Sequence, residues 1–183
     1  MHYAVKANSS LGVLGLLAQQ GVGADIVSGG EMKRALIAGI APDKIVFSGV
    51  GKTDDEIRAA LQAGISQINA ESGTELRHIS QIAAETARQA PVALRVNVNV
   101  DAGSHAKIST GQRSTKFGIP VADGEAAMLY RQLCSDPNLI PRGLAVHIGS
   151  QLRKLEPFER AYQELLALAD MLRSEGLDVP CLL

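Results

Sequence analysis

The stretch Ala24-Asp-Ile-Val-Ser-Gly-Gly-Glu31 contains the unit that the chain repeats. Ala24–Val27 is a short, mostly apolar run without strict polar alternation, which is typical of a strand buried on both faces. Ser28 and Glu31 follow at the spacing of a capping box, a common start of a helix. The same box recurs at Thr53-Asp-Asp-Glu56 and Ser72-Gly-Thr-Glu75. The chain is therefore predicted to alternate buried strands with helices.

Strands are expected at six places, each before a helical stretch: Tyr3–Ala7, Ala24–Val27, Lys44–Ser48, Gln67–Ala70, Val92–Val98 and Leu144–Ile148. Helix-ending glycines follow three of the helices, at Gly21, Gly39 and Gly64. A seventh strand is expected to begin in Val179–Leu183, so both ends of the chain look cut. About six βα units fit either an open doubly wound sheet or part of a (β/α)8 barrel, which takes ~250 residues.

Composition excludes several classes of protein. The net charge of −1 over 183 residues argues against nucleic acid or an anionic membrane as partner. No apolar run approaches the ~20 residues of a membrane span, and the N-terminus reaches a charge too early for a signal peptide. We therefore expect a cytoplasmic protein. We expect no metal site, because no set of His, Asp and Glu residues has the spacing of metal ligands. Cys134 and Cys181 are predicted to be buried.

Two glycine motifs resemble nucleotide-binding loops but fail on position. Ser48-Gly-Val-Gly-Lys-Thr53 follows a strand, yet a P-loop needs glycine where Val46 stands. Gly21-Val-Gly23 precedes a strand instead of following one. Backbone N–H groups at Ser28-Gly29-Gly30 or Gly149-Ser150 remain candidates for holding a phosphate.

Several charged residues interrupt the apolar strands. Lys6 lies in one of them, and burial would favour the neutral, nucleophilic amine; the alternative is a lysine that reaches solvent at the strand end. Asp25 occupies another apolar position, and Arg95 needs an anionic partner if it is buried. Glu31 caps a helix and is still able to face a lysine. His147 is either a core residue or a functional one.

Polar residues also recur where the predicted strands end: Lys6, Ser28, Ser48, Glu71, Asn97 and His147. In barrels, active sites form at the carboxyl ends of the strands. We therefore expect these side chains to converge on one rim as an active site.

Five ordered motifs resemble the fold-type III, pyridoxal-phosphate-dependent amino-acid decarboxylases. Four of them are Tyr3-Ala-Val-Lys-Ala-Asn8, Ala24–Glu31, Asn69-Ala-Glu-Ser72 and His147-Ile-Gly-Ser-Gln151. The fifth, Val100–Gly111 with Lys116-Phe-Gly-Ile119, is similar to the diaminopimelate branch rather than the ornithine branch. The resemblance covers essentially the whole chain. It implies an incomplete (β/α)8 TIM-type barrel of the alanine-racemase-like type.

The resemblance also implies roles for individual residues. Lys6 would bind pyridoxal 5'-phosphate as the internal aldimine, and His147 would stack on the cofactor ring. Ser150 and the backbone around Gly149 would contact the phosphate. The polar shell that orients Lys6 and His147 would consist of Asp25, Glu31 and Arg95.

The implied reaction removes the carboxylate at the D-centre of meso-diaminopimelate, an amino-acid substrate, giving L-lysine and CO2. Residues 1–183 would form part of the pyridoxal-phosphate-binding barrel, and the C-terminal β domain would be absent. A homodimer is expected of the full-length protein, whereas the short chain is expected to be inactive alone. Val96-Asn-Val-Asn99 departs from the family's Val-Asn-Pro-Asp. The alternatives are an ornithine, arginine or carboxynorspermidine decarboxylase, an alanine-racemase-like protein, and a non-catalytic homologue that binds the cofactor or acts as a scaffold.

Overall fold

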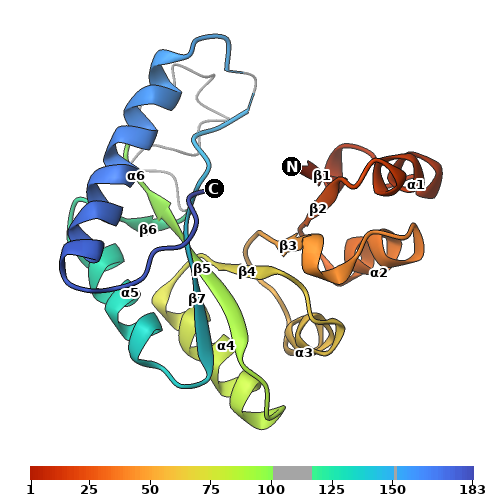
Figure 1. Cartoon of the computed structure of the whole chain (residues 1–183), viewed down its shortest axis with the longest axis horizontal. Coiled ribbons are helices and arrows are strands. Elements are labelled where there is room, and N and C mark those ends of the chain that lie inside the picture. The colour runs from red at the N-terminus through yellow and green to blue at the C-terminus, as the bar shows by residue number, and fades with distance from the viewer. Residues whose placement is uncertain (101–116, 151) are drawn as a thin grey trace. The chain divides into compact units, whose positions relative to one another are not determined.

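The computed structural model describes residues 1–100, 117–150 and 152–183, in two compact units. The first unit comprises Met1–Asn69, Arg77–Pro91 and Pro137–Leu139; the second comprises Ala70–Leu76, Val92–Asp136 and Ile140–Leu183. Figure 1 labels the helices and strands of both units.

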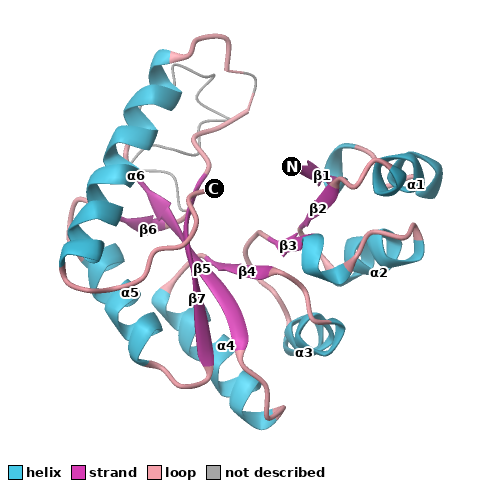
Figure 2. Ribbon diagram, in the orientation of Figure 1, coloured by secondary structure: helices cyan, strands magenta, loops and turns pink. Residues whose placement is uncertain are grey.

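The first unit repeats strand and helix in chain order. Its strands are β1 (His2–Ala4), β2 (Gly23–Ile26), β3 (Ile45–Phe47) and β4 (Gln67–Ala70), and each pairs in parallel with the next. Its helices are α1 (Leu11–Gln19), α2 (Gly29–Ile37) and α3 (Asp54–Ala63), with short 3-10 turns η1 (Val5–Ala7) and η2 (Pro42–Lys44). The three helices lie on one side of the strands (Figure 2). The α/β repeat predicted for this half is confirmed.

The second unit is built on two long strands, β5 (Ala90–Asn97) and β7 (Leu139–Val146), which pair with each other. β5 also pairs in parallel with the short β6 (Ile119–Pro120). The helices are α5 (Glu125–Ser135) and α6 (Glu156–Ser174), while α4 (Gly73–Glu85) begins in this unit and ends in the first. Arg131 of α5 donates two 2.7 Å hydrogen bonds to Glu175, just after α6, and so ties the two helices together.

The predicted seventh strand begins where expected. Leu144 of β7 forms a parallel bridge with Leu182. The Leu144 N–H donates to the Cys181 carbonyl at 3.0 Å, and the Leu183 N–H donates to the Leu144 carbonyl at 3.0 Å. Gly143 permits this approach, because a Cβ there would lie 1.9 Å from the Cys181 carbonyl oxygen.

All three predicted helix starts are confirmed, but at α2 and α4 the glutamate accepts from a different N–H group than in a capping box. Thr53 and Glu56 form the full reciprocal capping box at α3. At α2 the Ser28 hydroxyl accepts from the Glu31 N–H at 3.2 Å, but the Glu31 carboxylate reaches back to the Val27 N–H at 2.8 Å. Glu75 repeats this longer reach at α4 with the Glu71 N–H, at 2.7 Å. All three predicted helix-ending glycines have positive φ, as expected.

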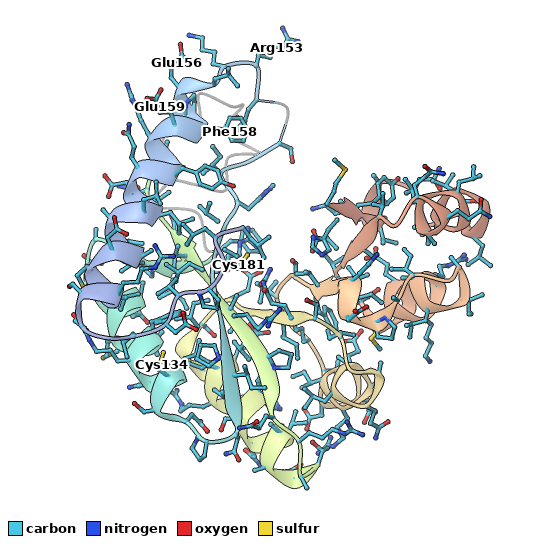
Figure 3. All side chains as sticks on the ribbon, viewed as in Figure 1. Cys134, Arg153, Glu156, Phe158, Glu159 and Cys181 are labelled. Carbon is cyan, nitrogen blue, oxygen red and sulfur yellow. The ribbon has the colours of Figure 1, made fainter. Side chains whose placement is uncertain are left out.

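Burial agrees with the predicted two-sided burial of strands for β3 and β4, whereas no residue of β1 is buried. Every residue of β3 and β4 is buried, as are Ile57, Ala60 and Leu61 on α3. On α6, Leu165, Ala169 and Leu172 are buried. Phe158, labelled in Figure 3, and Tyr162 continue the same helical spacing but are 39% and 42% exposed. Ala161 faces inward in their place. Neighbouring residues on a helix differ by about 100°, so Tyr162 turns to the rim of the stripe.

Strand bounds and cysteines needed correction. The first strand ends at Ala4 rather than Ala7, because residues 5–7 form η1, and β7 begins five residues before the predicted Leu144. Cys181 is exposed and Cys134 half-buried, so burial of both was wrong. Burial raises the pKa of the Cys134 thiol above its ordinary value. No helix in the described ranges is long and apolar enough to span a bilayer.

Candidate functional site

The polar residues singled out at strand ends lie there in the structure. In the first unit, Lys6 follows β1, Ser28 follows β2 and Ser48 follows β3. In the second unit, Glu71 follows β4, Asn97 ends β5 and His147 follows β7. Because parallel strands present their carboxyl ends at one edge, the three residues of the first unit share that edge. That all six meet at one rim stays a prediction.

Lys6 is exposed and lies in η1, the turn that follows β1. Of the two alternatives for Lys6, burial inside a strand is excluded, because the chain leaves the extended conformation at Val5 and buries that side chain instead. Lys6 is thus the strand-end lysine of the alternative. Ala4, two residues before Lys6, pairs with Asp25 of the neighbouring strand β2.

Asp25 is the acceptor at the end of a run of hydrogen bonds across three strands. The Ser48 hydroxyl donates to Asp25 Oδ1 at 2.5 Å, and the Asn69 side-chain amide donates to Ser48 Oγ at 3.0 Å. The Gln67 amide donates to Asn69 Oδ1 at 2.6 Å. We call these four residues the polar chain. Gln67 and Asn69 are buried on β4 and were missed; two amides inside an otherwise buried strand were the available signal.

The N-terminus of α2 holds a carboxylate of the protein itself. The Gly29 N–H donates to Glu56 Oε1 at 2.7 Å, and a Cβ on Gly29 would lie 3.0 Å from Glu56 Cγ. The hydrogen bonds from the Gly29 and Thr53 N–H groups hold the pKa of Glu56 below its ordinary value. Since an anion already uses this amide, the Ser28-Gly29-Gly30 alternative for a phosphate is not favoured. Glu31 lies in the same turn, with its carboxylate on the Val27 N–H.

Lys52 turns inward, which explains why the P-loop resemblance is only apparent. Its ammonium donates to the carbonyls of Gly49 at 2.6 Å and Asn69 at 2.8 Å, and it lies 5.6 Å from the centre of the Phe47 ring. Lys52 is half-buried, whereas Lys33 and Lys44 are exposed. A lysine held by protein carbonyls does not face a nucleotide phosphate.

Arg95 has the anionic partner that its position demanded. Its Nη1 lies 2.7 Å from Glu71 Oε1, and the two side chains are 14% and 4% exposed. The guanidinium also lies 5.6 Å from the centre of the Phe117 ring. A pair this buried fixes both side chains, because breaking it would leave a charge without its partner. The sequence indicated the need for a partner, but not that Glu71, at the end of β4, would meet it.

His147, Gly149 and Ser150 lie together after β7, the neighbour of β5, on which Arg95 lies. His147 and Ser150 are exposed, which excludes the core alternative for His147. Gly149 has φ of 129°, a conformation that side chains rarely adopt. Gln151, His105 and most of the 100–119 stretch lie outside the described residues. In the part of the chain that the structure describes, no three His, Cys, Asp or Glu residues gather as a metal site.

Residues 1–182 match the sequence profile of a family described as pyridoxal-dependent decarboxylase, pyridoxal binding domain. The chain belongs to this family. Its fold and its cofactor class, pyridoxal phosphate, therefore agree with the resemblance seen in the motifs.

Two curated relatives of the chain are diaminopimelate decarboxylases. The chain is 50% identical over 177 residues to a diaminopimelate decarboxylase of Pseudomonas aeruginosa, covering 97% of the chain and 42% of the relative. It is 54% identical over 176 residues to one of Pseudomonas fluorescens, with 96% and 42% covered. The chain therefore spans about 42% of the length of these pyridoxal-dependent decarboxylases.

Solved structures of the family superpose closely. Helicobacter pylori diaminopimelate decarboxylase in complex with L-lysine has a TM-score of 0.93 and 44% identity, with 97% of this chain and 45% of that one covered. The arginine decarboxylase of Paramecium bursaria Chlorella virus has a TM-score of 0.81 and 25% identity, with 99% and 46% covered. The chain therefore has the α/β fold of the pyridoxal-binding barrel in these decarboxylases.

Proposed function

We propose that the chain is the pyridoxal-phosphate-binding part of an enzyme that decarboxylates meso-diaminopimelate to L-lysine and CO2. Lys6 carries the proposal: it lies in a motif similar to the family's cofactor-lysine motif, and it is exposed just after the carboxyl end of β1. Diaminopimelate decarboxylases at 50% and 54% identity support the substrate. The arginine decarboxylase is only 25% identical, which argues against that alternative.

The residues present fit the cofactor. An exposed primary amine is accessible to an aldehyde, while Gly149, at φ of 129°, has a backbone conformation that side chains rarely adopt, next to the Ser150 that would contact a phosphate. With the α2 N-terminus filled by Glu56, Gly149-Ser150 is the better supported of the two phosphate sites. When bound, pyridoxal phosphate accepts the electron pair left by the departing carboxylate.

The chain's own residues would bind and orient the reactants. Lys6 Nζ would bind the cofactor and, once released by substrate, hold a proton beside the reacting carbon. His147 would cover the cofactor ring. Asp25 would present a carboxylate whose orientation the Ser48 hydroxyl fixes at 2.5 Å.

Arg95 and Glu31 complete the proposed shell. Arg95 would act through a guanidinium already fixed by Glu71 at 2.7 Å. Glu31 would combine orientation of Lys6 with its bond to the Val27 N–H. A homodimer and a cytoplasmic location are part of the same proposal.

The test joins residues 1–183 to the remaining sequence of the Pseudomonas aeruginosa relative and measures CO2 release. We expect release from meso-diaminopimelate but not from ornithine, arginine or carboxynorspermidine, and its loss in Lys6→Ala. Lys33→Ala, which removes an exposed lysine of α2, is the matched control and should keep full activity. Faster release from any of the other substrates would overturn the proposed one, and no release from any would favour the non-catalytic homologue.

A further inference from the structure

Lys52 joins two segments that carry the polar chain. Its ammonium donates to the Gly49 carbonyl, in the loop after β3, and to the Asn69 carbonyl, at the end of β4. Ser48 directly precedes Gly49. The Lys52 ammonium therefore holds the backbone next to Ser48 and the backbone of Asn69, the two residues that a side-chain hydrogen bond joins. Lys52 of the P-loop-like motif therefore has a structural role in linking the two segments.

Asn69 is the residue through which this contact reaches the polar chain. Its backbone carbonyl accepts from Lys52 at 2.8 Å, its side-chain oxygen accepts from Gln67 at 2.6 Å, and its side-chain amide donates to Ser48 at 3.0 Å. Asn69 is 6% exposed, so a displaced amide has little water to replace its partners.

Every bond of the polar chain points toward Asp25. Gln67 donates to Asn69, Asn69 donates to Ser48, and Ser48 donates to Asp25 Oδ1. Oδ1 is the Asp25 oxygen that accepts the last of these hydrogen bonds. An Asn69 that shifts would therefore release the hydroxyl that orients the Asp25 carboxylate.

We propose that Lys52 is a positioning residue of the cofactor site: it fixes the loop after β3 against β4, and through Asn69 and Ser48 it orients Asp25. This inference rests on the proposed function, in which Asp25 belongs to the polar shell around the cofactor. Lys52 itself touches neither cofactor nor substrate in this account.

The first test needs no cofactor. Lys52→Met removes the ammonium and keeps an unbranched apolar side chain. Lys44→Met is the matched control, since Lys44 also donates to a carbonyl, that of Gly21 at 3.2 Å, but lies outside the polar chain. We expect the Asn69 side-chain amide to exchange with solvent at least about tenfold faster in Lys52→Met, with Lys44→Met unchanged. Equal exchange in all three proteins would overturn the inference.

The second test measures pyridoxal phosphate affinity of the 183-residue chain by its absorbance. Lys52→Met should bind about tenfold more weakly than the parent. In a Ser48→Ala background, where the polar chain is already broken, Lys52→Met should add less than about twofold. An equal, additive loss in both backgrounds would show that Lys52 acts only through stability and would overturn the inference.

The two tests separate the inference from the proposed function. Should the parent chain bind no pyridoxal phosphate, the proposed function would fail, while amide exchange would still decide whether Lys52 positions Asn69. Should Lys52→Met unfold, Ser48→Ala alone must reproduce the tenfold loss of affinity with exchange of the Asn69 backbone amide unchanged. A Ser48→Ala chain with parental affinity would overturn the route to Asp25.

Discussion

Lys6 is exposed and lies in η1, directly after the buried Val5. The Lys6 amine is therefore reached by solvent rather than buried. A lysine of this kind depends on its neighbours for activation, and the nearest strand offers the ordered carboxylate of Asp25. At the scale of the residue, the candidate groups such as Lys6 are exposed, whereas the side chains that fix their neighbours, such as Asn69 and Glu71, are buried and hydrogen-bonded.

His147→Ala should weaken pyridoxal phosphate binding about fivefold, since a ring stacked on the cofactor contributes about 1 kcal/mol. His147 is exposed, so the melting temperature without cofactor should change by less than about 2 °C. The matched control is His78→Ala on α4, which removes another exposed imidazole, paired with Asp54 at 2.9 Å. A lower melting temperature with unchanged cofactor affinity would contradict the stacking role.

Positions at this scale could be predicted from sequence, but partners could not. Strand ends follow from local patterns, and Lys6, Ser48 and His147 lie at them. Arg95 meets Glu71 from 24 positions away, and Gly29 meets Glu56 from 27. Such pairs depend on how neighbouring strands align, which no local pattern determines.

At the scale of the element, α2 and α3 are joined by one side chain. Glu56 closes the capping box of its own helix and also accepts from Gly29, the first residue of α2. The box itself was predictable from four residues. The second bond was not, because it depends on the two helices lying side by side.

The hydrogen bond from Gly29 to Glu56, which joins α2 and α3, predicts that the free energy of unfolding depends on pH. The pKa of Glu56 is lowered in the folded state, mainly by the Gly29 N–H, so its stabilisation is present above the unfolded pKa of about 4.3 and is lost as the pH falls through the folded value. Glu56→Gln should therefore lower the free energy of unfolding at pH 7, and this difference should shrink toward pH 3. Asp55→Asn, the same charge change on an exposed neighbour, is the control in urea unfolding. A difference independent of pH would contradict this account.

The strand after α6 depends on Gly143. A methyl group there would meet the Cys181 carbonyl oxygen at 1.9 Å, and φ is 121°, so Gly143→Ala should lower the free energy of unfolding by about 3 kcal/mol. Gly176→Ala isolates the conformational part, because φ is 83° but nothing lies within 4 Å, and should cost about 1 kcal/mol. Denaturant titration measures both, and equal losses would show that the close approach of the strands is not what requires glycine.

At the scale of the whole molecule, the βα order predicted the fold class because each strand and cap is a local signal. The end of β1 and the start of β7 were harder to predict. Val5 and Ala7 are apolar like strand residues, although residues 5–7 form a turn. The first half of β7 contains Pro141 and Gly143. Both residues are unfavourable in strands, so the pattern favours a later start. Assembly of the six strand ends into one rim remains a prediction.

The 183-residue chain alone should release no CO2 from meso-diaminopimelate above background. It spans about 42% of its relatives, and β1 lies at one end of the strand order, with β2 as its neighbour. An edge of this kind favours association, so sedimentation should show oligomers. Addition of the remaining sequence of a relative should restore turnover; turnover by the short chain at a similar rate would contradict this expectation.

The central claim is that Lys6 holds the cofactor, and reductive trapping tests it most directly. The chain is incubated with pyridoxal phosphate, reduced with borohydride, digested and mapped by mass spectrometry. The account predicts that the adduct lies on Lys6, with Lys33, Lys44, Lys52 and Lys154 unmodified at the same cofactor ratio. An adduct on any of those lysines with Lys6 unmodified would contradict it.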